Sequence, residues 1–311
     1  MAPRRGDLPR WKHLVTARWL VDLLRGESVI AAPAGNWCLF DVSFDAAALF
    51  ALGHIPGAAY LDTNQLEQEP LWNKVPDAQL LRLLAHIGVD RNSTAILYGR
   101  NTTAAARAAH LMLYAGVPDV RLLDGGLAAW TRAGLPLASG APHVYAPAGH
   151  FGADLPLNPH YLVHTPDVRS LLAKGNATLA SIRTWEEFVG KTSGYDYIEA
   201  KGEIPGAVWG RAGEAGDMNS MSAFQNPDGT MKPADEILGF WRGAGILPGV
   251  RTVFYCGTGW RASLAFFYAW LMGWDNIAVY DGGWLDWSSD PANPRLVGAV
   301  DHEVSSAQYA P

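Results

Sequence analysis

The chain alternates between short apolar runs and longer segments with helical periodicity. The predicted strands are 37–43, 95–99, 177–183 and 252–256, each bounded by glycine, proline or polar residues. The predicted helices span 80–88 and 236–245 and begin near residues 104 and 262. Thr16 and Thr165 are each placed to cap a further short helix. Strands that alternate with helices favour an α/β fold around a mainly parallel sheet.

This pattern occurs twice along the chain. The segment LLDGGLAAW at 122–130 matches VYDGGWLDW at 279–287, and GHIPGA at 53–58 matches GEIPGA at 202–207. A repeat this long is a domain, because solenoid repeats have periods of about 20 to 50 residues. The second copy has a few additional residues, expected within 211–230. We predict two tandem domains of one fold, each a mainly parallel sheet flanked by helices, at 1–138 and 160–311, joined by an extended linker at 139–159.

The composition is that of a soluble globular protein. Of 311 residues 49% are hydrophobic, and a net charge of −6 argues against binding to nucleic acid or to an anionic membrane surface. The most apolar run, 264–274, is about half the ~20 residues of a membrane span and predicts a buried helix. The basic start of the chain lacks the apolar segment of an export signal. We therefore expect a cytoplasmic monomer, or a periplasmic one if a signal has been removed.

The residues that indicate a reactive site lie in the segment TVFYCGTGWRASLAFFYAW at 252–270. A predicted strand ends at Cys256, two glycines follow, and an apolar helix begins near Arg261. Gly257 and Gly259 let the loop curl with its N–H groups pointing inward, and the positive end of the helix points to the same centre. That environment stabilises a thiolate or a persulfide anion, so we predict that Cys256 is a nucleophile.

The other cysteine and the other copy lack these features. Cys38 lies inside an apolar strand, where an inert buried cysteine is expected. The residue that aligns with Cys256 in the first copy is Gly99, so the first domain has no nucleophile. We predict that this domain is catalytically inactive and acts as a scaffold.

Taken together, these residues resemble the tandem rhodanese family of thiosulfate and 3-mercaptopyruvate sulfurtransferases. The resemblance rests on IPGA in both halves, DGG before a tryptophan in both halves, and the Cys-Gly-Thr-Gly-Trp-Arg loop, which is similar to a bacterial multi-domain subgroup. It implies a sulfurtransferase (EC 2.8.1 class) in which Cys256 takes sulfur from a small anionic donor. The persulfide then passes sulfur to a thiol, to cyanide or to a protein thiol. It implies no metal and no organic cofactor.

The resemblance also assigns roles to the remaining site residues. Gly257, Thr258, Gly259, Trp260 and Arg261 form the loop that stabilises the persulfide. Arg183 matches the arginine that binds the donor's negative charge in the family, and Arg261 adds a second positive charge. The other donor-binding arginine of mercaptopyruvate enzymes falls near Val189 here, so Lys191 is expected to compensate. Trp260 points either into the donor pocket or into a domain interface. The comparison of the two copies assigns the rest. Both copies contain DGG and only one has the thiol, so Asp281, Gly282 and Gly283 are predicted to form a turn and a helix start, and His54 and its counterpart Glu203 to be structural.

Two other functions use the same cysteine. Phosphatases related to rhodaneses also frame a loop with Cys and Arg, but with five residues between them, whereas four separate Cys256 from Arg261. The shorter loop fits a sulfur atom better than a phosphate. A persulfide carrier or sulfide-responsive module would use Cys256 without fast turnover, and the sequence does not separate this role from catalysis.

Overall fold

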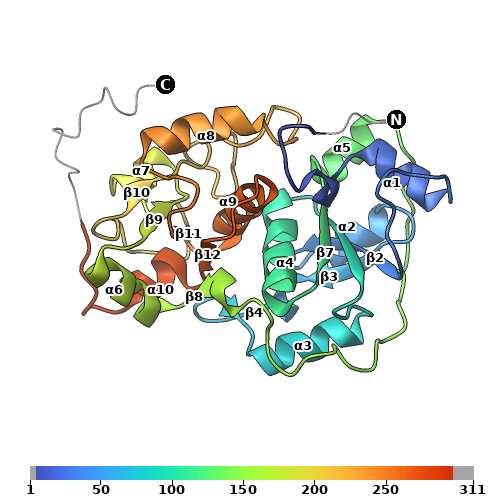
Figure 1. Ribbon diagram of the computed structural model, residues 1–311, viewed down its shortest axis with the longest axis horizontal. Helices are drawn as coiled ribbons and strands as arrows, with labels where there is room; N and C mark the ends of the chain where they lie inside the picture. The colour runs from blue at the N-terminus through green and yellow to red at the C-terminus, as the bar shows by residue number, and fades with distance from the viewer. Residues whose placement is uncertain (1–4, 297–311) are drawn as a thin grey trace. The chain divides into compact units, whose positions relative to one another are not determined.

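The computed structural model describes residues 5–296, so the ends of the two predicted domains, 1–4 and 297–311, lie outside the described residues. The chain divides into two compact units, drawn in Figure 1. The first comprises the chain up to Glu69, Lys74–Tyr161 and Asn226–Met231. The second comprises Pro70–Asn73, Leu162–Gln225 and the chain from Lys232 onward.

The first unit is built on a five-stranded sheet in the order β1-β7-β6-β2-β3, with neighbouring strands parallel. These strands are β1 (Leu14–Val15), β2 (Trp37–Ser43), β3 (Ala59–Asp62), β6 (Thr94–Tyr98) and β7 (Asp119–Leu123). The helices are α1 (Ala17–Leu24), α2 (Ala47–Leu52), α3 (Asp77–His86), α4 (Thr102–Ala115) and α5 (Gly126–Arg132). Two short strands, β4 (Glu67–Gln68) and β5 (Asn73–Lys74), precede α3.

The second unit has a five-stranded parallel sheet in the order β10-β9-β11-β12-β8. Its strands are β8 (Leu162–Val163), β9 (Thr178–Ser181), β10 (Val208–Trp209), β11 (Thr252–Tyr255) and β12 (Ile277–Tyr280). Its helices are α6 (Thr165–Lys174), α7 (Trp185–Phe188), α8 (Ala234–Gly243), α9 (Trp260–Leu271) and α10 (Gly283–Ser289). Strand for strand this repeats the first unit, which confirms the predicted α/β fold and its duplication.

Helices cover both faces of the second sheet. Apolar side chains alternate along β11 and point to both faces, so each face needs a helix to bury them. Val253 and Tyr255 share a core with Trp284 of α10. Phe254 points to the opposite face, where its ring stacks on Trp241 of α8 with centroids 5.3 Å apart. The central strand is therefore buried on both sides, as its continuous apolar sequence predicts.

The most apolar run of the sequence forms most of a buried helix. α9 packs against β11 and β12 (Figure 1), and all of its residues from Arg261 to Leu271 are buried. A helix that is apolar all round needs protein on every side, and this position provides it. The prediction of a buried helix here is confirmed.

One of the two predicted helix caps is confirmed and one is wrong. Thr16 caps α1, accepting a hydrogen bond from the Trp19 N–H at 3.2 Å. α6 begins one residue earlier than expected, so its N-cap is His164 and Thr165 is already helical. The Thr165 hydroxyl instead donates to the Asp286 carboxylate of α10.

The stretches outside the repeated elements also have defined places. Residues 139–158 form neither helix nor strand, and Pro159 begins a short 3-10 helix. Two N–H groups of this segment bond the first unit: that of His143 donates to the Ala58 carbonyl at 3.0 Å and that of Ala148 to the Ala85 carbonyl at 2.8 Å. The additional residues predicted within 211–230 fall in turns between β10 and α8.

Candidate active site

Cys256 lies where the central strand of the second sheet ends. β11 is flanked by β9 and β12, and the chain turns through Cys256–Gly259 into α9, as predicted from the sequence. Carboxyl ends of parallel strands meet at one edge of a sheet, so Arg183 after β9 and Asp281 after β12 lie at the same edge. Cys256 is only 1% exposed, so its sulfur is largely shielded from water.

The Cys256 sulfur faces a backbone amide and a helix end. The Gly259 N–H donates to Sγ at 3.2 Å, and α9 begins at the next residue. Gly259 has φ +105°, a backbone conformation that residues with a Cβ rarely adopt, so glycine is required there. The amide and the positive end of α9 both stabilise negative charge on the sulfur.

The start of α10 holds the loop from the other side. The Cys256 and Gly257 carbonyls accept hydrogen bonds from the Trp284 N–H (2.8 Å) and the Leu285 N–H (3.0 Å). This approach requires glycine at 283, because a Cβ there would lie 2.6 Å from both carbonyl oxygens. The DGG motif is therefore a close-packing device at the start of α10, in agreement with its predicted role.

A buried ion pair fixes the far end of the loop. Both oxygens of Glu187 accept hydrogen bonds from the Arg261 guanidinium, at 2.8 and 2.9 Å, and both side chains are 1% exposed. The same guanidinium donates to the Tyr195 hydroxyl. Burial has the largest single effect on Glu187 and raises its pKa. The charge and hydrogen bonds of Arg261, together with the Arg183 charge and the Thr184 N–H, oppose burial and hold the pKa below its ordinary value. Arg261 thus anchors the loop through a charge-assisted fork.

Arg183 is also buried, and its guanidinium is occupied by protein groups. It donates to the Gly202 carbonyl at 2.8 Å, lies 3.4 Å from a Glu203 oxygen, and sits over the Trp284 ring at 5.0 Å. Glu203 in turn accepts a hydrogen bond from Ser181, so this carboxylate is part of the buried structure, as predicted. Contact between Arg183 and a donor stays a prediction.

The remaining predicted residues differ in exposure. Thr258 is buried in the loop, and Trp260, the first residue of α9, is half-buried. Lys191 is exposed just after α7, and among residues 5–296 its side chain has no ion-pair partner. Lys191 is therefore the predicted donor-binding cation that is open to a ligand in this conformation.

Sequence reasoning did not identify Glu187 and Tyr195 as parts of the site. The Thr184-x-x-Glu187 spacing is a capping-box signature and predicts the helix start that α7 shows. It gives no sign that Glu187 also binds Arg261, 74 residues later. Tyr195 lies in a segment without helix or strand, where no periodicity indicates its direction.

Cys38 has the inert environment that the sequence predicted. It is buried in β2, and its thiol points to the Gly88 carbonyl at 3.6 Å. Burial, with a smaller effect from Asp90, raises the pKa of the Cys38 thiol to about 11. At neutral pH this thiol is protonated and a poor nucleophile.

The loop of the first unit at Gly99 is closed to a side chain. A Cβ at Gly99 would lie 2.6 Å from the Asn101 carbonyl oxygen and 2.7 Å from that of Val42. The Arg100 guanidinium donates to the Leu49 and Gly53 carbonyls, and Asn101 caps α4. The backbone has therefore filled the space that the thiol occupies in the second unit.

Restoring a cysteine at position 99 is expected not to create a second site. Gly99→Cys in a Cys256→Ser background should show no mass gain of about 32 after thiosulfate treatment, since the side chain meets backbone oxygens. The same clash should lower the free energy of unfolding by ~1–3 kcal/mol. Intact mass and urea denaturation measure the two effects. A sulfur adduct on this double variant would show that the first loop is competent.

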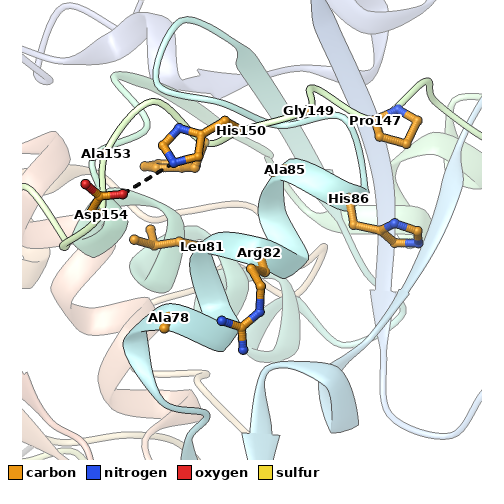
Figure 2. A pocket seen from close by; sticks show the side chains of 11 residues that line it. Ala78, Leu81, Arg82, Ala85, His86, Pro147, Gly149, His150, Ala153 and Asp154 are labelled. Carbon is orange, nitrogen blue, oxygen red and sulfur yellow. Dashed lines mark ion pairs between the residues drawn. The ribbon is translucent and has the colours of Figure 1, made fainter.

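A cavity of about 490 Å³ lies within the first unit, between α3 and the segment 147–154 (Figure 2). Leu81, Ala85 and Phe151 are among its apolar lining residues. Figure 2 shows the His150–Asp154 ion pair, whose Nε2 and Oδ1 atoms lie 3.4 Å apart, beside the cavity. None of its lining residues belongs to the Cys256 loop, and it contains no cysteine.

Neither a metal centre nor a membrane helix occurs in the described part of the chain. Residues 5–296 contain no group of three or more His, Cys, Asp or Glu side chains placed to bind a metal ion. Across the same residues, no helix is both long and apolar enough to cross a membrane.

Comparison with known proteins places the chain among sulfurtransferases. The rhodanese-like domain family matches residues 16–133 and 165–290. Thiosulfate sulfurtransferase YnjE of Escherichia coli (strain K12) is 52% identical over 295 residues, which are 95% of this chain and 67% of YnjE. Its crystal structure superposes with a TM-score of 0.90 over 94% of this chain and 70% of that chain.

Two further relatives have other names. The sulfur carrier protein TtuD of Thermus thermophilus is 30% identical over 256 residues, covering 78% of this chain and 84% of TtuD. The anaerobic ergothioneine biosynthesis enzyme from Chlorobium limicola, in complex with trimethyl histidine, is 35% identical with a TM-score of 0.88, covering 94% of this chain and 72% of that chain.

The fold and these matches define a class, the sulfurtransferases. Within it, the chain belongs to the rhodanese-like family and has two rhodanese-like domains in tandem. The resemblance found in the sequence is therefore confirmed.

Proposed function

We propose that the chain transfers sulfur from a small anionic donor, thiosulfate or 3-mercaptopyruvate, by carrying it as a persulfide on Cys256. The observation that carries this proposal is the Gly259 N–H aimed at the Cys256 sulfur, at the N-terminus of α9 in a buried loop. In a site shielded from water, such fixed dipoles stabilise an anion strongly and need no reorganisation. The similarity to a thiosulfate sulfurtransferase supports the choice of donor.

The reaction divides into two half-reactions at the same atom. The Cys256 thiolate attacks the outer sulfur of thiosulfate or the single sulfur of 3-mercaptopyruvate, and a new sulfur–sulfur bond forms. The donor's own sulfur–sulfur or carbon–sulfur bond breaks, and the electron pair leaves with sulfite or with the enolate of pyruvate, which then takes up a proton. An acceptor such as cyanide, a small thiol or a protein thiol then attacks the outer sulfur of the persulfide and releases the Cys256 thiolate. The Gly259 amide and the α9 N-terminus face the negative sulfur in both steps.

In this proposal the first domain does not take part in the sulfur transfer. Its loop lacks both the thiol and the space for one, which supports the assignment of residues 1–138 as an inactive scaffold. The linker at 139–159 and the catalytic domain at 160–311 complete the proposed organisation.

The second candidate function is a persulfide carrier with slow turnover. It is favoured by the similarity to a protein named as a sulfur carrier and by the burial of Cys256, which would protect a stored sulfur. A carrier and an enzyme form the same persulfide, so they differ in rate. Steady-state turnover with thiosulfate and cyanide separates them.

Both donors are expected to load Cys256, with less than about a hundredfold difference in kcat/KM. Arg183 and Arg261 are occupied by carboxylates or carbonyls, so in this conformation Lys191 is the predicted cation open to the donor. One charged contact is worth ~1.5–3 kcal/mol, or roughly ten- to a hundredfold.

Intact mass after treatment with each donor tests the loading, and kcat/KM with cyanide as common acceptor tests the preference. The expected adduct is about 32 mass units and disappears with cyanide. Absence of this adduct with both donors would overturn the proposed function. A preference of a thousandfold would show that additional contacts set the donor specificity.

A further inference from the structure

Tyr195 lies directly against the Cys256 loop. Its hydroxyl oxygen accepts hydrogen bonds from the Gly257 N–H at 2.9 Å and from the Arg261 guanidinium. The ring also covers Gly257, where a Cβ would lie 2.2 Å from the ring carbon that bears the hydroxyl. Glycine at 257 is thus required for this contact, and the contact places a polar group beside the reacting cysteine.

The Tyr195 hydroxyl can still donate one hydrogen bond. A phenol donates one hydrogen bond and accepts two, and both acceptor positions of Tyr195 are used. Among residues 5–296, no protein atom accepts its proton in a hydrogen bond. Burial raises the pKa of Tyr195 well above its ordinary value of 10, with the Arg261 charge opposing and Cys256 adding to the rise. The proton therefore stays on the oxygen at neutral pH.

The geometry points to a role for this proton: we propose that Tyr195 donates a hydrogen bond to the outer sulfur of the Cys256 persulfide. This inference rests on the proposed function. During loading the Cys256 thiolate bonds the outer sulfur of thiosulfate, the donor's sulfur–sulfur bond breaks, and sulfite leaves with the electron pair. The outer sulfur keeps the negative charge, and the Tyr195 proton is shared with it and not transferred.

The contact is selective for the sulfur-loaded state. In the unloaded enzyme the sulfur accepts from Gly259 and makes no hydrogen bond with Tyr195. A second sulfur extends the side chain by about 2.05 Å, the length of a sulfur–sulfur bond, and adds an acceptor beside the loop. The Gly257 N–H is already held by the tyrosine oxygen, so the hydroxyl replaces that amide as a donor to the bound sulfur.

The test compares Tyr195→Phe with Tyr197→Phe, a neighbouring exposed tyrosine whose ring centroid lies 5.4 Å from that of Tyr195. Phenylalanine keeps the ring over Gly257 and removes only the hydroxyl. In single-turnover loading with thiosulfate, followed by intact mass, Tyr195→Phe should be about tenfold slower than wild type, the size expected for one hydrogen bond to a charged group. Tyr197→Phe should match wild type.

A second measurement separates a bond to the persulfide from a role in shaping the loop. The rate at which iodoacetamide alkylates unloaded Cys256, followed from pH 6 to 9, should differ less than about twofold between Tyr195→Phe and wild type, because no bond to the free thiol is lost. Wild-type loading in Tyr195→Phe, or slowing of alkylation equal to that of loading, would overturn the proposal while leaving the proposed function intact. A wild-type protein that takes no sulfur would overturn both.

Discussion

Cys256→Ser is expected to lose thiosulfate:cyanide sulfurtransferase activity by at least about a thousandfold. A serine hydroxyl stays protonated beside the same loop, forms no persulfide and is a far weaker nucleophile than a thiolate. The variant should show no adduct of about 32 mass units after donor treatment. Steady-state kinetics and intact mass measure the two effects. Because serine fits the same buried space, circular dichroism should show an unchanged fold.

Cys38→Ser is the matched control, since it makes the same exchange at the other cysteine. Cys38 is buried in β2 with a thiol pKa of about 11, and within residues 5–296 its sulfur accepts no hydrogen bond from a backbone amide. This variant should keep both the adduct and the activity. Loss of the adduct in Cys38→Ser together with its survival in Cys256→Ser would reverse the assignment of the nucleophile.

Glu187→Gln should be the most destabilising single change at the site. Both Glu187 oxygens bind Arg261, and the Thr184 N–H donates to one of them at 2.7 Å. Removing the charge leaves Arg261 buried without its carboxylate. Breaking a buried ion pair in this way costs about 3–5 kcal/mol. The melting temperature should fall by roughly 6–20 °C, and sulfur loading should fall with it because Arg261 no longer anchors the loop.

The stability that Glu187 contributes should depend on pH and be lost in acid. The folded-state pKa of Glu187 lies below its ordinary value of 4.5, so the carboxylate contributes its full stability above pH 4.5. That contribution is lost as the pH falls from 4.5 through the lowered folded-state value. The difference in free energy of unfolding between wild type and Glu187→Gln should therefore be largest near neutral pH and shrink in acid.

Glu186→Gln supplies the control for Glu187→Gln. The two glutamates are adjacent on α7, but Glu186 is half-buried and its side chain has no ion-pair partner among residues 5–296. Its substitution should change the free energy of unfolding by less than about 0.5 kcal/mol. Equal effects of the two substitutions would show that the Arg261 pair contributes no more than a surface charge.

The features that the sequence predicted correctly are those carried by local pattern and repetition. Alternating strands and helices, the duplication and the buried α9 follow from periodicity within short windows. The position of Cys256 at a strand-to-helix turn follows from TVFYC and from the two glycines after it. A small error remained at a helix boundary: the N-cap of α6 is His164 and not Thr165, which is the first helical residue.

By itself, then, the sequence determined the α/β class and the two tandem domains, and it predicts Cys256 as the nucleophile, because each depends on residues that are neighbours along the chain. The tertiary structure alone decided what surrounds Cys256. Arg261 meets Glu187 across 74 positions, and Gly257 meets Tyr195 across 62. A sequence shows that an arginine is present but not whether its guanidinium forms an ion pair with a carboxylate of the same protein. That depends on which strands are neighbours in the sheet and how the loops at its edge pack together.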